Sequence, residues 1–169
     1  MSAGRSLYVI ASAAPPVLGI AEGIDALQQR WNVSLILSPA AASWIDVDKL
    51  AATTGCLVRS EARLPTEQDP LPKADAILAA PLTFNTLNKW AAGIADTLAV
   101  AILCELLGTG VPITAVPCVK QALREHPAYS DSITRLREAG VRFVDADPLS
   151  HRRDDGLVGF DWSRVAREM

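Results

Sequence analysis

Three polar side chains that can form hydrogen bonds follow an apolar run near the middle of the chain. The run spans residues 76–80, and Thr83, Asn85 and Thr86 come just after it, where a long apolar segment begins. This order is typical of a strand that leads into the start of a helix. Open α/β sheets hold their ligands at such strand ends, and helix N-termini bind anions. The segment Pro81–Leu98 therefore predicts a ligand-binding pocket.

Polar residues end three other apolar runs in the same way. Ser12 and Ser38 each end a run in the first part of the chain, and the segment Pro117–Lys120 ends one further along. Taken singly, Ser12 and Ser38 would serve as a helix cap and a turn residue. Because the carboxyl ends of parallel strands meet at one edge of a sheet, we expect these groups to converge with Thr83.

Short apolar runs alternate with segments of helical periodicity along most of the chain. A continuous apolar strand followed by a helix is the pattern of a parallel sheet covered on both faces, which predicts an α/β fold with three layers. We expect Asp46 to cap a helix internally and Asp96 to cap a segment after a break near Gly93. The expected strands are 7–11, 33–37, 56–59, 76–80, 112–116 and 141–144, and the expected helices are 17–31, 40–52, 84–107, 129–139 and 161–167. Residues 60–73 and 145–159 are expected to be irregular.

The composition excludes several classes of protein. The 169 residues suit one domain, 1–169, with a core at about 6–144 and a C-terminal extension at 145–169. A net charge of −3 argues against a nucleic-acid partner. The apolar run 98–107 is too short to cross a membrane, and no signal peptide is evident, so we expect a cytoplasmic protein. The three cysteines lack metal-ligand spacing, which predicts no metal site.

The strand ends favour one cofactor class over others. No glycine-rich GxGxxG turn follows the first strand, no acidic residue ends the second, and no phosphate loop of the Walker type is present. The available donors are hydroxyl groups and the backbone amides at helix starts, which suit a single phosphate group. These features favour a mononucleotide such as FMN over NAD or ATP.

The segment that follows the fourth predicted strand carries a known signature. The signature consists of Pro81, Asn85, Thr86, Lys89, Gly93, Asp96 and Leu98. In residue types and spacing it resembles that of the homo-oligomeric flavin-containing cysteine decarboxylases, which include phosphopantothenoylcysteine and lantibiotic peptidyl-cysteine decarboxylases. The resemblance implies a doubly wound, Rossmann- or flavodoxin-like fold that binds FMN, and it covers residues 7–144.

The resemblance also implies roles for individual residues. Ser12 and Ser38 correspond to positions near the flavin phosphate, and Thr83 and Thr86 correspond to positions that contact the flavin. Asn85 corresponds to a residue of the same site, which in decarboxylating members meets the substrate carboxylate. Members of the family form trimers with the flavin at a subunit interface, which implies a homotrimer or a multiple of it here.

Two elements of the decarboxylase site are replaced in this chain. The family places a histidine in the segment that corresponds to residues 63–75, and this segment contains none. A second motif, Pro-x-Met-Asn-x-x-Met-Trp, keeps Pro117 but has Lys120 in place of its asparagine and Arg124 in place of its tryptophan. We therefore expect flavin binding to be retained and cysteine decarboxylation to be disfavoured.

Several hypotheses about chemistry stay open at this point. Candidate catalytic residues are Asn85, Lys120, which can hold an anion, and His126, which can act as an acid or base near neutral pH. Cys118 would serve as a redox thiol if it were exposed and its pKa lowered. The first hypothesis is an FMN-dependent enzyme acting on a small molecule or peptide. The alternatives are a noncatalytic flavin-binding or regulatory module and a true peptidyl- or phosphopantothenoyl-cysteine decarboxylase.

Overall fold

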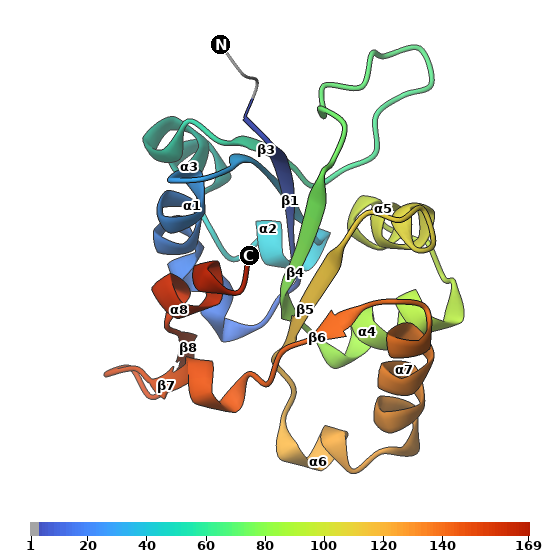
Figure 1. Cartoon of the computed structure of the whole chain (residues 1–169). Helices are drawn as coiled ribbons and strands as arrows, with labels where there is room; N and C mark the ends of the chain where they lie inside the picture. Colours follow the sequence, from blue (N-terminus) through green and yellow to red (C-terminus); the bar gives the residue numbers. More distant parts are fainter. Residues whose placement is uncertain (1–3) are drawn as a thin grey trace.

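A computed structural model describes residues 4–169, so the first three residues of the N-terminal segment lie outside the described part. Its centre is a parallel sheet with strand order β3-β2-β1-β4-β5-β6 (Figure 1). This order is that of the Rossmann fold, in which the chain reverses direction across the sheet beside the first strand. The strands are β1 (Ser6–Ala11), β2 (Asn32–Leu37), β3 (Leu57–Arg59), β4 (Ala76–Leu82), β5 (Ile113–Pro117) and β6 (Arg142–Phe143).

Helices connect the strands, and side-chain caps mark where several of them begin. Asp46 accepts a hydrogen bond from the backbone of Lys49 at 3.0 Å, which confirms it as a cap and divides the expected 40–52 helix in two. The helical segments are η1 (Pro15–Gly19), α1 (Ile20–Gln28), α2 (Pro39–Ala42), α3 (Val47–Thr54), α4 (Phe84–Ala92), α5 (Leu98–Leu106), α6 (Gln121–Arg124), α7 (Pro127–Glu138), η2 (Asp147–Leu149) and α8 (Trp162–Arg167). Residues 60–75 form a long connection without helix or strand, as expected.

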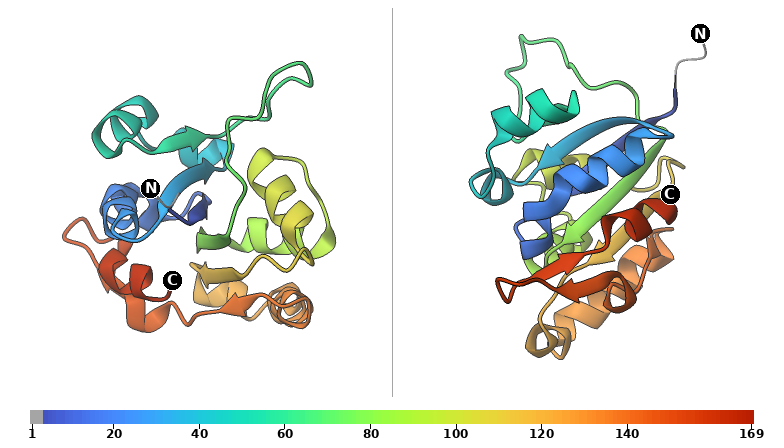
Figure 2. Two further views of the ribbon diagram at one scale, coloured as in Figure 1. Left: turned by 45° about the horizontal axis from the view of Figure 1, so that its top comes forward. Right: turned by 90° about the vertical axis from the view of Figure 1, so that its left-hand side faces the viewer.

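The two faces of the sheet are covered by different helices (Figure 2). Side chains alternate along β1, so Leu7 and Val9 pack with α1 and α8, whereas Tyr8 and Ile10 pack with α4, α5 and α7. Every residue of β1 and β4 is buried, which explains their continuous apolar sequences. The three-layer, doubly wound α/β fold is confirmed.

The break in the long helix lies where the sequence predicts it, but its cap is a different residue. Gly93 ends α4 with φ of 72°, a left-handed conformation that glycine adopts without strain. The expectation that Asp96 caps the next helix is wrong, because Thr97 occupies that position and its hydroxyl accepts a hydrogen bond from Val100. Asp96 instead binds Lys89 in a salt bridge.

The C-terminal segment is more ordered than its polar sequence suggests. The expectation of an irregular 145–159 segment is wrong, because β7 (Ser150–Arg152) and β8 (Val158–Phe160) pair as an antiparallel hairpin. The following α8 packs on α1 and buries Trp162, whose indole Nε1 donates to the carbonyl of Pro16 at 3.2 Å. A Cβ atom at Gly23 would lie 2.6 Å from the Trp162 ring, so only glycine permits this close packing.

Candidate functional site

A cavity of about 1090 Å³ lies at the carboxyl ends of β1, β2, β4 and β5. This is the edge of the sheet where the strand order reverses between β1 and β4, the usual ligand position in open α/β sheets. Small-molecule sites commonly occupy about 300–1,000 Å³, so this cavity can hold a large ligand or two smaller ones. The predicted convergence of Ser12, Ser38 and Thr83 with Lys120 is confirmed, because all four line it.

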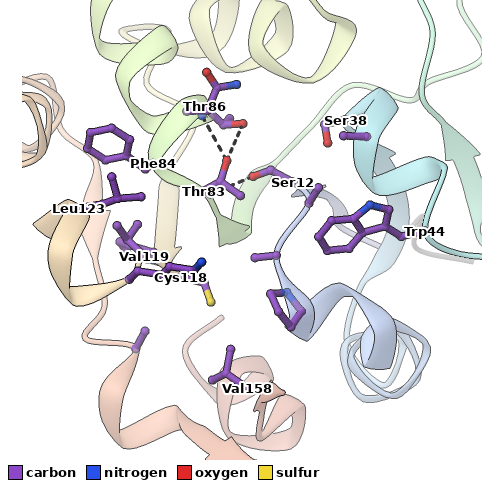
Figure 3. A pocket seen from close by; sticks show the side chains of 18 of the residues that line it. Ser12, Ser38, Trp44, Thr83, Phe84, Thr86, Cys118, Val119, Leu123 and Val158 are labelled. Carbon is purple, nitrogen blue, oxygen red and sulfur yellow. Dashed lines mark hydrogen bonds between the residues drawn. The ribbon is translucent and has the colours of Figure 1, made fainter. Parts of the chain in front are cut away.

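Hydroxyl groups from three strand ends form one side of the cavity, which we name the hydroxyl wall (Ser12, Ser38, Thr83 and Thr86) (Figure 3). The Ser12 hydroxyl donates to the carbonyl of Pro81 at 3.0 Å and accepts from the amide of Thr83 at 3.1 Å. Thr83 Oγ1 then caps α4 by accepting from the amide of Thr86, and it donates to Thr86 Oγ1 at 3.2 Å. These bonds lock the loop after β1 to the start of α4.

The four hydroxyl groups differ in whether their hydrogen is already used in a bond within the protein. Ser12 and Thr83 each direct their hydrogen to a protein acceptor. Ser38 accepts from the amide of Ala41 at 3.1 Å, and Thr86 accepts from Thr83, so the hydroxyl hydrogens of both residues remain available to a ligand. Since a hydroxyl group has one donor, a phosphate on this wall fits Ser38 and Thr86 better than Ser12.

The signature segment contains residues that build the helices as well as residues that face the cavity. Asn85 lines the cavity and is exposed at the first turn of α4. Lys89 and Asp96 pair across the turn between α4 and α5, and the carboxylate's hydrogen bond from Lys89 lowers the pKa of Asp96. Gly93 ends α4, so these three residues lie at the connection between the two helices. Part of the signature is therefore explained by folding alone.

A second group of lining residues carries charge, and we name it the basic wall (Lys120, Arg124, Asp147 and Arg152). Arg124 binds both carboxylate oxygens of Asp147, at 2.8 and 3.1 Å. These hydrogen bonds raise the pKa of Arg124 and lower that of Asp147. Both groups are therefore charged near neutral pH, and the pair ties α6 to η2, just before the hairpin.

Apolar and sulfur-containing side chains also line the cavity (Figure 3). Phe84, Val119 and Leu123 lie on one side and Trp44 on the other, and Cys118 points into the space between Val119 and Val158. Burial raises the pKa of the Cys118 thiol, although the nearby charge of Arg124 acts in the opposite direction. The condition set for a redox thiol, exposure with a lowered pKa, is not met.

His126 lies outside the residues that line the cavity. Its ring stands edge-on to the Phe84 ring, with 5.6 Å between the centroids, and Phe84 itself lines the cavity. Its Nδ1 atom accepts a hydrogen bond from the amide of Ala128 at 3.0 Å and so caps α7. His126 therefore packs against a lining residue and does not line the cavity itself, and its Nδ1 atom already accepts a hydrogen bond.

Two contributors to the cavity were missed by sequence reasoning. Trp44 is 48% exposed and lies beside Ser38 at the end of β2. The hairpin supplies Arg152 and Val158 from a segment expected to be irregular. A tryptophan six residues after a strand-end serine was a usable signal, whereas nothing local in residues 150–158 indicates that they contribute to the cavity.

Within residues 4–169, no helix combines the length and apolar character needed to cross a bilayer. Among the solved structures, the chain is similar to a mutant of PPC decarboxylase complexed with pantothenoylaminoethenethiol, with a TM-score of 0.79, 19% identity and coverage of 98% of this chain and 96% of the other. It is also similar to the FMN-dependent cysteine decarboxylase SpaF, with a TM-score of 0.73, 20% identity and coverage of 97% and 94%. These similarities show a shared fold.

The sequence comparisons place the chain in a family. It is 33% identical over 73 residues to the coenzyme A biosynthesis bifunctional protein CoaBC of Thermococcus kodakarensis, a match that covers 43% of this chain and 18% of that protein. The chain spans less than a third of the length of the curated relatives that it matches. The model of the Flavoprotein family matches residues 1–163. The chain therefore belongs to the Flavoprotein family.

Proposed function

We propose that the chain binds FMN in the cavity and acts as a flavin-dependent oxidoreductase or decarboxylase-like enzyme on a small molecule or peptide. The observation that carries this proposal is the hydroxyl wall, where Ser38 and Thr86 keep free donors beside the starts of two helices. Such donors suit one phosphate group. When bound, FMN supplies hydride chemistry, for which the residues of this chain provide binding, orientation and exclusion of water.

The size of the cavity supports a cofactor together with a substrate. Its volume of about 1090 Å³ reaches the upper end of the range for small-molecule sites. In this proposal Ser38 and Thr86 hold the phosphate, whereas Ser12 and Thr83 hold the loops in place. Asn85 lies on the same edge and is assigned to a carboxylate of the substrate, since its side-chain amide can donate two hydrogen bonds.

The chemistry on the substrate is the finer part of the proposal. Residues 63–75 contain no histidine, and Lys120 and Arg124 occupy the second motif of the cysteine decarboxylases. We therefore favour a flavin-dependent reaction other than standard cysteine decarboxylation. A noncatalytic flavin-binding or regulatory module is the second candidate, favoured by the position of His126 behind Phe84 and by the raised pKa of Cys118.

Assembly and location belong to the same proposal. A homo-oligomer, with a trimer expected from the family resemblance, is part of the proposal, and its interface would cover exposed apolar side chains such as Leu64 and Ile94, which are 64% and 49% exposed. Sedimentation equilibrium of the flavin-loaded protein checks this. The three cysteines are free thiols, which is typical of a reducing compartment such as the cytoplasm.

Two measurements test the proposed function. The purified chain is titrated with FMN, and we expect saturable binding with a raised melting temperature, because a ligand that binds the folded state stabilises it. Absence of binding would contradict both the enzyme and the module. The FMN-loaded protein is then mixed anaerobically with thiols and with reduced nicotinamides. Bleaching of the flavin absorption supports an enzyme, and a flavin that no donor reduces supports the noncatalytic module.

A further inference from the structure

A second, smaller cavity lies between α5 and the connection that follows β3, and we name it the α5 cavity. Its lining comes from α5, from residues 59–71 and from Tyr8, and its volume is about 380 Å³, within the range of small-molecule sites. Within the described part of the chain it shares no lining residue with the larger cavity. On α5, Val100 lines the larger cavity, whereas Leu98 and Ala101 line the smaller one. A ligand in the α5 cavity therefore leaves the other cavity free.

The buried part of this lining is apolar apart from one hydroxyl group. Ile102 is buried and Leu71 is partly buried, and both pack in the same hydrophobic cluster as Tyr8. The Tyr8 hydroxyl donates to the carbonyl of Pro72, so its oxygen can still accept a hydrogen bond from a ligand. Burial raises the pKa of this hydroxyl, and the nearby Asp69 carboxylate acts in the same direction, so the group stays protonated at neutral pH.

The charged part of the lining contains two cations and two carboxylates. Arg63 and Asp69 form a long salt bridge, with 3.9 Å between Nε and Oδ2. Within residues 4–169, neither Arg59 nor Glu105 has an oppositely charged group within 4.0 Å. Arg59 donates to the backbone carbonyl of Glu61 and keeps most of its five donors free. One cation and one carboxylate in this cavity are therefore available to a ligand.

The two unpaired charges belong to the two segments that enclose the cavity. Arg59 ends β3 and is half-buried, and Glu105 lies in the last turn of α5 and is exposed. A ligand complements both side chains when it carries one positive and one negative group. A planar guanidinium binds a carboxylate through two parallel hydrogen bonds, and a carboxylate binds an ammonium group.

We propose that the α5 cavity binds an α-amino acid with an apolar side chain. Arg59 holds the carboxylate of the ligand, and Glu105 and the Tyr8 hydroxyl oxygen accept hydrogen bonds from its ammonium group. The apolar side chain of the ligand contacts Leu71 and Ile102. The inference goes beyond the proposed function, because it assigns a second ligand to a cavity that is separate from the flavin site.

The experiment compares L-leucine with two analogues that each lack one of its charges. Isoamylamine has no carboxylate, and 4-methylpentanoate has no ammonium group. The purified chain is titrated with each compound by isothermal calorimetry, and wild type is compared with Arg59→Gln and Glu105→Gln. Matched controls are Arg30→Gln and Glu22→Gln, which remove exposed charges outside the lining of the α5 cavity.

We expect wild type and both controls to bind L-leucine about tenfold more tightly than either analogue. Arg59→Gln should weaken leucine binding about tenfold and leave isoamylamine unchanged, whereas Glu105→Gln should weaken leucine binding about tenfold and leave 4-methylpentanoate unchanged. This crossed pattern separates the loss of one charged contact from a folding defect. Absence of saturable leucine binding in wild type, an analogue that binds as tightly as leucine, or an unchanged leucine affinity in either variant overturns the proposal.

A second copy of the chain is the competing occupant of the α5 cavity. Ala101→Arg places a long side chain in the cavity from α5. We expect this variant to lose leucine binding and to sediment as wild type does. Dissociation of the wild-type oligomer by Ala101→Arg would identify the cavity as part of a subunit interface and overturn the proposal.

Discussion

The two walls of the cavity differ in how they are held and in what they offer. The hydroxyl wall is fixed by hydrogen bonds to the backbone, such as that from Ser12 to Pro81, and two of its members are buried. The basic wall is fixed mainly by the exposed Arg124–Asp147 pair and offers charged side chains. Because backbone bonds constrain geometry more tightly than exposed side chains do, the first wall suits a group that is held in one fixed position, and the second suits a ligand whose position is less constrained.

The largest expected effect tests whether the C-terminal segment is part of this arrangement. Replacing Trp162 by alanine removes a buried ring and its hydrogen bond to the carbonyl of Pro16 in η1, the segment that follows Ser12. We expect the free energy of unfolding to fall by about 3–5 kcal/mol, measured by urea denaturation. Trp44→Ala is the control, since Trp44 is half exposed and its loss should change stability little. If Trp162→Ala lowered the free energy of unfolding as little as Trp44→Ala does, the C-terminal segment would not be an integral part of the fold.

The next effect separates the phosphate from the rest of the flavin. Ser38→Ala removes a free donor from the hydroxyl wall, so we expect affinity for FMN to fall about tenfold while affinity for riboflavin is nearly unchanged. Isothermal calorimetry with both flavins measures this. Ser43→Ala is the matched control, because Ser43 does not line the cavity and its hydroxyl donates to the carbonyl of Ala40. An equal loss for riboflavin would mean that Ser38 acts only by capping α2.

A third variant tests Asn85, which lines the cavity but belongs to neither wall. Asn85→Asp places a negative charge at the first turn of α4, which should repel a carboxylate substrate and leave the flavin in place. We expect affinity for N-acetylcysteine to fall about tenfold, read from the flavin spectrum. If FMN binding is lost instead, Asn85 faces the cofactor. Because aspartate has nearly the same size and shape as asparagine, a packing defect would not explain either result.

The smallest expected effect concerns the thiol that lines the cavity. Burial raises the pKa of Cys118, so its thiolate is rarer at neutral pH than that of a free cysteine, and its fraction rises only as the pH increases toward that raised pKa. We expect iodoacetamide to modify it more slowly than free cysteine at pH 7.5, with the rate increasing as the pH rises. Mass spectrometry of tryptic peptides measures the rate, and Cys118→Ala identifies the peptide. Rapid modification at pH 7.5 would restore the redox-thiol hypothesis.

Local sequence signals predicted the hydroxyl wall well and the basic wall poorly. Ser38 and Thr83 follow apolar runs that become strands, so their place at the sheet edge follows from the order of the elements. The bond between Ser12 and Thr83 joins residues 71 positions apart, which periodicity cannot reveal. The position of Arg152 in the cavity lining could not be predicted for another reason. Its segment is rich in charge and owes its strand form to backbone pairing with β8.

The most direct test of the two-wall account is a crystal structure of the chain with FMN bound. The account predicts that the phosphate lies within hydrogen-bonding distance of Ser38 Oγ and Thr86 Oγ1. It also predicts that space remains between the flavin and the basic wall, with Lys120 and Arg152 free of the cofactor. A phosphate bonded to Lys120 or Arg152 would contradict the account, because the basic wall would then hold the cofactor.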